Sequence, residues 1–274
     1  MVAVLEEKIG ENVQTMILRF KSVFFLVVCL CLAGACSSNN TIVSSEQKVL
    51  VFSKTAGFRH DCIPDGIALI RQLGNDNGFV VEATTDQDDF TLENLQQYKA
   101  VIFNNTTGDV LTPEQETAFE NYIRSGGGYV GIHAASDTEY DWEWYGKLAG
   151  AYFLDHPGMT DTFPGIQQGI LKVQDTSNRI TAHLPEFWTK RDEFYNFKSI
   201  QPGLNVLLTI DEESYRGGKN GAFHPMTWFR EFDGGRSFYT ALGHTRESYA
   251  EPEFQQLLLR GILYALGRDA ISNQ

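Results

Sequence analysis

The sequence predicts an α/β protein whose central sheet is mostly parallel and carries helices on both faces. From Gln47 onward, short apolar runs alternate with segments of helical character through the first half of the chain. Such alternation is typical of βαβ units, whose strands run in one direction. The 274 residues are 42% hydrophobic, and we find no internal repeat, low-complexity tract or convincing linker. One domain with ample core is therefore expected.

The first half supplies strands and helices in strict alternation. Strands are predicted at 49–52, 79–83, 100–104 and 129–132, and helices at 64–73 and 113–123. Pro64 suits the first turn of its helix. Thr112 is a good N-cap residue, Pro113 fits the first helical position, and Gln115 completes a capping box. The second helix ends at three consecutive glycines, and the fourth strand follows at once.

The second half is less regular. Strands are predicted at 170–173 and 206–210, and a closing amphipathic helix at 252–266. The segments 226–229 and 236–242 flank the turn Asp233-Gly234-Gly235, so they are expected to pair as a hairpin.

Polar side chains follow several of these strands at the point where each strand ends. Asn104 and His133 come directly after apolar runs, His244 follows the hairpin's second strand, and His60 lies in the loop after the first strand. The carboxyl ends of parallel strands share one edge of a sheet, where open α/β folds bind ligands. We therefore expect these four side chains to converge on one crevice.

His133 is the sharpest candidate of the four. Small residues, Gly131 before it and Ala134-Ala135 after it, suit a tight strand-to-helix turn like a nucleophile elbow, with imidazole in place of serine or cysteine. Histidine at such a position favours proton transfer or ligand binding. The alternative for any single histidine is a satisfied polar residue, which is the role expected for His183.

A second group of candidates combines acids with aromatic residues. Asp192, Glu193 and Tyr195 lie within a short aromatic segment that reads either as a charged loop or as part of a sugar site. Aromatic faces contact the C–H groups of a pyranose, while carboxylates accept hydrogen bonds from its hydroxyls. His156 is expected to fasten a loop. The residues proposed for substrate binding are Arg59, His60, Asn104, Tyr195, His224, Trp228, His244 and Arg246.

A metal site is left open rather than assigned. Histidines with acidic residues could bind a divalent ion such as zinc, but no His-x-His or His-x3-His pair occurs. The ligands would have to come from distant loops. We therefore assign no metal ligand and no cofactor at this stage.

The charge balance limits the partners. The formal net charge is −13, and it belongs to the body of the chain because residues 1–35 carry equal numbers of acids and bases. An acidic body argues against nucleic acid, which is bound by clustered lysine and arginine. Neutral ligands such as sugars are more compatible with an acidic protein than nucleic acids are.

The first 36 residues have the pattern of a signal peptide. Arg19 and Lys21 precede an apolar run too short to span a bilayer, and the run leads to Cys36, the cysteine of a lipobox-like sequence. We expect lipidation at Cys36 and a location on the periplasmic side of a bacterial membrane; an ordinary secretory signal is the alternative. Translation starts at Met1 or Met16. Residues 37–47 form a short polar linker. Cys62 is the one cysteine beyond Cys36, so no intrachain disulfide is expected.

Four motifs together resemble the ThuA-like (trehalose utilisation) family, over residues 48–268. They are Lys54-Thr55-Ala56-Gly57-Phe58-Arg59-His60, the glycine-rich segment 126–137 around His133, Asp192-Glu193-Phe194-Tyr195, and 234–244 ending at His244. The resemblance implies a flavodoxin-like three-layer sandwich of the class I glutamine amidotransferase-like superfamily. True amidotransferases have cysteine at the elbow, where this chain has His133, so amidotransferase chemistry is excluded.

The family name implies a role in disaccharide catabolism, on keto sugars made by a partner sugar dehydrogenase. The leading hypothesis is a sugar-active lyase, isomerase or hydrolase, with His133 as acid/base and Glu193 or Asp192 as its partner. Adjacent residues of an extended segment point opposite ways, so only one of the two acids can face the cleft. The alternatives are a non-catalytic sugar-binding lipoprotein and a metal-dependent hydrolase.

Overall fold

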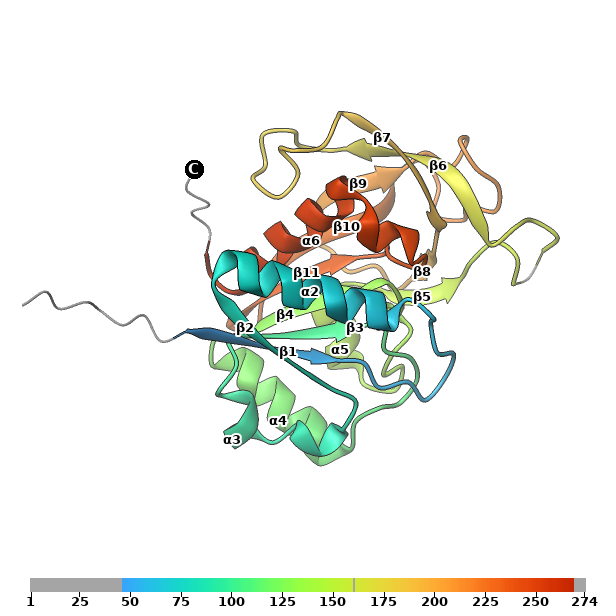
Figure 1. Ribbon diagram of the computed structural model, residues 1–274. Helices are drawn as coiled ribbons and strands as arrows, with labels where there is room; N and C mark the ends of the chain where they lie inside the picture. The colour runs from blue at the N-terminus through green and yellow to red at the C-terminus, as the bar shows by residue number, and fades with distance from the viewer. Residues whose placement is uncertain (1–45, 160, 269–274) are drawn as a thin grey trace, which may run out of the picture. The chain divides into compact units, whose positions relative to one another are not determined.

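A nine-stranded sheet runs through the described part of the computed structural model, which covers residues 46–159 and 161–268 (Figure 1). Its strands lie in the order β2-β1-β3-β4-β11-β10-β9-β6-β7. Their bounds are β1 (Gln47–Phe52), β2 (Phe79–Thr84), β3 (Ala100–Asn104), β4 (Gly128–Ile132), β6 (Ile166–Val173), β7 (Phe187–Glu193), β9 (Asn205–Ile210), β10 (His224–Phe232) and β11 (Gly235–Thr240). A separate two-stranded sheet pairs β5 (Tyr152–Asp155) with β8 (Asn196–Lys198).

The strands from β2 to β11 are parallel neighbours, and those from β10 to β7 extend the sheet by antiparallel pairing. The expected fold class is confirmed, and so is the hairpin of β10 and β11 around Asp233. The register aligns the carboxyl ends of the central strands, because Phe52 lies opposite Phe103, and Ile132 lies between Asn104 and Thr240. Loops that leave these strands therefore start from one edge.

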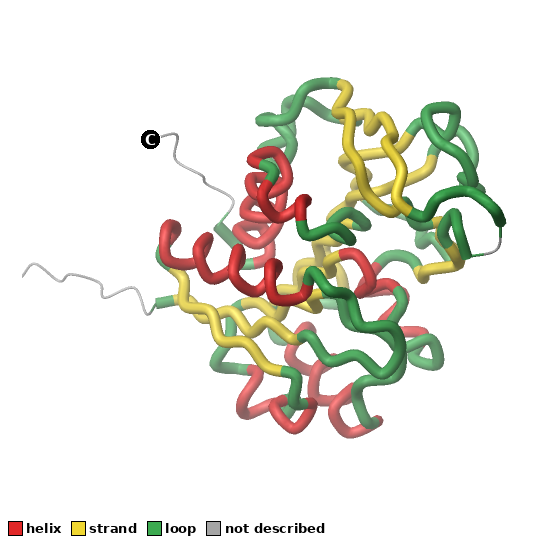
Figure 2. Tube along the Cα trace, turned by 45° about the vertical axis from the view of Figure 1, so that its right-hand side comes forward, coloured by secondary structure: helices red, strands yellow, loops and turns green. Residues whose placement is uncertain are grey.

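Helices cover both faces of the sheet. Helices α2 (Ile63–Asn77) and α6 (Pro252–Ala265) lie on one face, and α3 (Leu92–Leu95), α4 (Pro113–Arg124) and α5 (Glu143–Ala149) lie on the other (Figure 1). Figure 2 shows the helices in red on both sides of the parallel strands. Short 3-10 turns follow at Gln87–Asp89, His133–Ser136 and Glu247–Ala250. Within the described ranges, no helix is long and apolar enough to cross a membrane.

The central strands are buried on both faces, which explains their nearly continuous apolar sequences. Every residue of β3 and β4 is buried, as expected for parallel strands covered by helices. Phe103 lies at the centre of an aromatic core, with ring centroids 5.4 Å from those of Phe52 and Phe119. This packing fixes the ends of β3 and β4, where the polar residues begin.

Two differences from the sequence prediction have clear physical causes. Helix α2 continues past Leu73 because Gly74 is a packing residue rather than a stop; a Cβ there would lie 2.6 Å from the carbonyl oxygen of Phe79. The helix ends at Gly78, which adopts φ +67°. Strand β7 was missed because three of its buried residues, Lys190, Asp192 and Glu193, are charged, whereas a strand is recognised by apolar residues on its buried side. Strands β5 and β8 and helix α5 were not predicted either.

The capping box of α4 is confirmed and gives a stability prediction. Thr112 Oγ1 accepts a hydrogen bond from the Gln115 amide, and the Gln115 side chain accepts one from the Thr112 amide. We expect Thr112→Ala to lower the free energy of unfolding by about 1 kcal/mol. The matched control is Thr117→Ala on the same helix, which exchanges an exposed interior threonine for the best helix former and is expected to be neutral or slightly stabilising. Urea unfolding measures both, and equal effects would contradict the prediction.

Candidate functional site

The loops at the carboxyl edge bring four titratable side chains together. His60 follows β1, His133 follows β4, His244 follows β11, and Glu193 ends β7. One nitrogen or oxygen atom from each lies within 4.8 Å of the others. The convergence expected of four side chains is found for the three histidines but not for Asn104, which is absent from this group and from the cavity lining. We call His60, His133, Glu193 and His244 the His/Glu cluster.

Three members of the His/Glu cluster, His60, Glu193 and His244, form the floor of a cavity of about 440 Å³. Aromatic and titratable side chains line this cavity. They are Phe58, His60, Asp137, Phe153, His156, Met159, Glu193, Tyr195 and His244. His133 is absent from this lining and is fully buried, so its ring lies beneath the floor rather than in the cavity.

The elbow at His133 has the expected strained geometry. His133 has φ +47°, in the left-handed region that non-glycine residues rarely adopt. Its carbonyl oxygen accepts a hydrogen bond of 2.7 Å from the Tyr239 hydroxyl. Its Nδ1 lies 2.7 Å from the carbonyl oxygen of Ala241, which can only accept, so Nδ1 carries the proton. The Nε2 atom therefore faces the centre of the His/Glu cluster.

Glu193 connects the members of this site. Its Oε2 lies 3.0 Å from His244 Nδ1 and 3.6 Å from His133 Nε2, and its Oε1 lies 3.3 Å from His156 Nδ1. Burial alone would raise the pKa of Glu193, but hydrogen bonding and positive charge from the protonated forms of His133 and His244 outweigh it and lower the pKa. The pKa of His244 is raised, because the hydrogen bond to Glu193 and its charge outweigh burial.

His60 completes the floor as a neutral ring. It is 4% exposed, and its ring meets those of His133 and His244 edge-on at centroid distances of 5.0 and 5.1 Å. Burial, followed by repulsion from the other two imidazoles, lowers the pKa of His60 to about 2. Its Nδ1 is buried and has no hydrogen-bond partner among the described residues.

Asp192 faces away from the cavity and anchors the loop that carries His244. Its carboxylate accepts hydrogen bonds from the amides of Gly243 (2.9 Å) and His244 (3.1 Å) and from the Ser248 hydroxyl (3.1 Å). Asp192 is fully buried, and Lys190 Nζ lies 3.6 Å from it. Of the two adjacent acids, Glu193 is therefore the one at the cavity, and Asp192 is a positioning residue.

Other residues predicted to bind substrate lie outside the cavity lining. Asn104 is buried below it and donates hydrogen bonds to Ser53 Oγ and the Ile63 carbonyl. Trp228 is buried and donates from Nε1 to the Ala149 carbonyl. These polar groups have local partners, so each has a structural explanation.

The remaining three predicted residues are also placed elsewhere. His224 is fully buried between Glu212 Oε1 and the carbonyl oxygen of Tyr195, so it supports the Tyr195 backbone rather than a ligand. Arg59 is exposed, and Arg246 forms an exposed ion pair with Asp65. Neither arginine lines the cavity.

The sequence missed His156, which was expected to fasten a loop. Its ring lines the cavity, its Nδ1 contacts Glu193, and its ring lies parallel to that of Tyr195 at 6.1 Å. Phe58, Asp137, Phe153 and Met159 were missed as well. The signal that could have identified His156 is the rarity of histidine. The chain has six histidines, and four of them lie at this site.

Cys62 offers no nucleophile to this site. It is fully buried, its Sγ donates to the Gly243 carbonyl at 3.3 Å, and burial raises its pKa to about 12. A thiol of this kind stays protonated and behaves as a small apolar residue.

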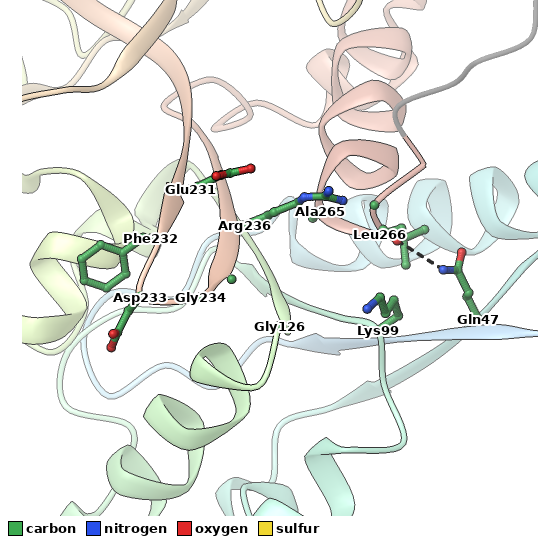
Figure 3. Close-up of a pocket in the computed structure, with 12 residues that line it drawn as sticks. Gln47, Lys99, Gly126, Glu231, Phe232, Asp233, Gly234, Arg236, Ala265 and Leu266 are labelled. Atoms are coloured by element: carbon green, nitrogen blue, oxygen red, sulfur yellow. Dashed lines mark hydrogen bonds between the residues drawn. The ribbon is translucent and has the colours of Figure 1, made fainter.

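A larger cavity of about 640 Å³ lies at the opposite edge of the sheet (Figure 3). It is lined by residues such as Lys99, Gly126 and Arg236, which precede or begin β3, β4 and β11. Gln47 there donates a hydrogen bond to the Leu266 carbonyl. Ligands of open α/β sheets bind at the carboxyl ends of strands, so we place function at the smaller cavity over the His/Glu cluster.

The anchoring role of Asp192 gives a second stability prediction. Asparagine has one acceptor oxygen in place of two, so Asp192→Asn leaves at least one buried amide of the His244 loop without an acceptor. We expect a loss of about 1–3 kcal/mol in the free energy of unfolding. Asp65→Asn removes only an exposed ion pair and should cost less than about 1 kcal/mol. Urea unfolding compares the two, and a loss for Asp192→Asn no greater than that of the control would refute the anchoring role.

Comparisons with known proteins agree with this fold. The ThuA-like protein of Bacteroides uniformis ATCC 8492 superimposes with a TM-score of 0.67 at 23% identity, over 80% of this chain and 91% of that chain. The ThuA-like protein of Parabacteroides merdae ATCC 43184 does so with a TM-score of 0.67 at 20% identity, over 83% and 92%. A beta-galactosidase from Bacillus circulans sp. alkalophilus shares the fold over 83% of this chain and 32% of its own (TM-score 0.51, 17% identity).

These identities show the fold alone, and no curated protein sequence matches the chain. A family model described as trehalose utilisation, ThuA, matches residues 48–265, which is most of the described part. The role is accordingly carbohydrate-related, and the chain belongs to the ThuA family.

Proposed function

We propose that this chain is an enzyme of carbohydrate catabolism that acts on a disaccharide or keto sugar in the cavity over the His/Glu cluster. The observation that carries the proposal is the combination of an aromatic-walled cavity with a floor of coupled titratable groups. Binding a neutral sugar needs aromatic walls and a few hydrogen-bonding groups. Four histidines around one carboxylate are more than binding requires, so chemistry is favoured.

The walls suit a sugar ring. Phe58 is 67% exposed at the rim, and the rings of Phe153 and Tyr195 pack together at a centroid distance of 4.3 Å. Aromatic faces of this kind contact the C–H face of a pyranose. Asp137 on the same wall can accept a hydrogen bond from a sugar hydroxyl.

His156 is the best placed group for proton transfer. Its Nδ1 lies within reach of two acceptors, the Pro157 carbonyl at 2.7 Å and Glu193 Oε1 at 3.3 Å, so this nitrogen carries the proton. The other nitrogen is then free to accept a proton, and the ring is partly exposed in the cavity. The pair has the arrangement of a general base held by a carboxylate. His133, predicted as the acid/base, would act from beneath the floor through Glu193.

The chemistry we propose is proton abstraction beside a keto group. His156 Nε2 takes the proton from the carbon next to the carbonyl, and the electron pair moves into the carbonyl oxygen as an enolate. In an elimination, return of the pair breaks the bond to the glycosidic oxygen, which leaves with the proton that His156 had taken. In an isomerisation, the enolate takes that proton back at another carbon or oxygen atom. A keto sugar has to be made by oxidation of the parent sugar, so the proposed partner is a sugar dehydrogenase.

The test is turnover of plain and 3-keto disaccharides by the purified protein, followed by proton NMR. We expect product from a keto substrate, and a rate lowered by at least about 100-fold in His156→Ala and Glu193→Gln, the usual contribution of general acid–base catalysis. His183→Ala is the matched control, because His183 lies outside the cavity and bonds the Glu253 carbonyl. Shifted or broadened sugar resonances without product would favour a non-catalytic binding protein.

Export is a separate proposal that rests on the sequence before residue 46, outside the described residues. We propose that Cys36 is lipidated and holds the protein on the periplasmic side of the membrane. A single lipid chain binds a membrane only weakly, so stable anchoring requires that the modified cysteine carry more than one chain. Cys36→Ser should move the protein from the membrane fraction to the soluble fraction in cell fractionation, and should abolish labelling with radioactive palmitate. Unchanged membrane association and labelling in the variant would contradict lipidation at this residue.

A further inference from the structure

We propose that the His/Glu cluster, His60, His133, Glu193 and His244, is a binding site for a divalent transition-metal ion of the zinc class. The site was not assigned from sequence because its ligands come from four separate segments, each at the end of a different strand or in the loop after it. The four residues are far apart in the sequence, but the fold brings their side chains close together.

The distances match those of a first coordination shell. Zinc binds histidine nitrogen and carboxylate oxygen at about 2.0–2.1 Å, so the ligand atoms of a tetrahedral site lie about 3.3 Å apart. The corresponding separations are 3.0 Å between Glu193 Oε2 and His244 Nδ1, 3.1 Å between His244 Nδ1 and His133 Nε2, and 3.6 Å between His133 Nε2 and Glu193 Oε2. These three atoms form one face of a tetrahedron of the required size, and His60 supplies a fourth donor within 4.8 Å.

The directions of the lone pairs point to a cation as well. His133 Nδ1 donates to the Ala241 carbonyl, so in the neutral ring the lone pair of Nε2 faces the lone pairs of Glu193 Oε2. His60 Nδ1 is buried and has no hydrogen-bond partner among the described residues, and the residue as a whole is only 4% exposed. Converging lone pairs and an unpartnered buried nitrogen are stabilised when a positive ion lies between them.

The proposed ligands are oriented by hydrogen bonds and contacts to neighbouring groups, as metal ligands in proteins usually are. Histidines that bind metals donate their other nitrogen to a carbonyl or carboxylate, which fixes ring orientation and tautomer. His133 does so to Ala241 at 2.7 Å. The backbone of His244 is held by buried Asp192, and the second oxygen of Glu193 contacts His156. The ligands are therefore held in place by groups that do not themselves face the centre.

The donor set selects the class of ion. Imidazole nitrogens with one carboxylate suit zinc and its first-row neighbours, whereas magnesium and calcium prefer oxygen ligands throughout. His60, Glu193 and His244 also line the cavity, so a substrate oxygen that approached from that side would add to the four protein ligands as a fifth. Resting on the proposed function, this identifies the substrate class as a sugar whose carbonyl oxygen the ion polarises as a Lewis acid, while His156 moves the proton.

The test is metal binding by the full-length, untagged protein without any sugar. Chelator-treated protein is titrated with Zn²⁺ by calorimetry, and metal content is measured by plasma mass spectrometry after gel filtration. We expect one ion per chain, and a loss of affinity in His60→Ala and in His244→Ala of at least about 100-fold, beyond the 10–100-fold typical of an outer contact. His183→Ala should bind as the unaltered protein does, because this histidine lies outside the cluster.

A measurement on the unaltered protein covers the case in which a variant fails to fold. Co²⁺ in a tetrahedral site with nitrogen and oxygen ligands absorbs strongly in the visible range, and we expect that spectrum to appear and to be displaced by Zn²⁺. Absence of a stoichiometric ion, only the weak spectrum of hexahydrated Co²⁺, or folded variants that bind as tightly as the parent would overturn the proposal. Metal binding without sugar turnover would refute the proposed enzyme alone. Turnover by the chelated protein would refute the role of the ion as a Lewis acid, whereas the site itself is decided by the binding measurements.

Discussion

The site depends on one electrostatic constraint: the protein buries an ionised carboxylate, Glu193, at the meeting point of four segments. Burial of an isolated charge is very costly, so the charge persists only where donors surround it. His244 and His156 lie within hydrogen-bonding distance of its two oxygens, and His133 lies just beyond. Each of these rings comes from a separate loop, so the need to satisfy one carboxylate ties those loops together.

The strand that carries Glu193 also carries a second buried acid, Asp192, which helps to place one of the donors around Glu193. Side chains alternate along β7, so Asp192 and Glu193 point to opposite sides although both are buried. Asp192 accepts the backbone amides of Gly243 and His244, which fixes where the His244 ring can lie. The two adjacent carboxylates therefore have different roles. Asp192 binds the backbone of the loop, and Glu193 binds the side chain of His244.

The part of this arrangement governed by local rules was predictable from sequence. Apolar runs locate β1, β3 and β4, and the shared edge of parallel strands brings His60 and His133 together. What the sequence left open or missed depended on long-range pairing. The choice between Asp192 and Glu193 required the register of β7 on β6, and the position of His156 required the pairing of β5 with β8. His224 and Trp228 have the right side-chain types, but their partners are buried backbone carbonyls, which no spacing in the sequence reveals.

The elbow at His133 combines the backbone geometry of a nucleophile elbow with an imidazole side chain. His133 retains the left-handed backbone and small neighbours that suit a nucleophile, and Cys62 is buried with its thiol on a carbonyl. With Nδ1 fixed on Ala241, the imidazole at the elbow presents a lone pair to Glu193 and His244 instead of a reactive thiol to a substrate. A centre of this kind is stabilised by a positive charge shared among its members, whether proton or metal ion. The same requirement that holds the loops together therefore also makes the centre a place where a positive charge is favoured.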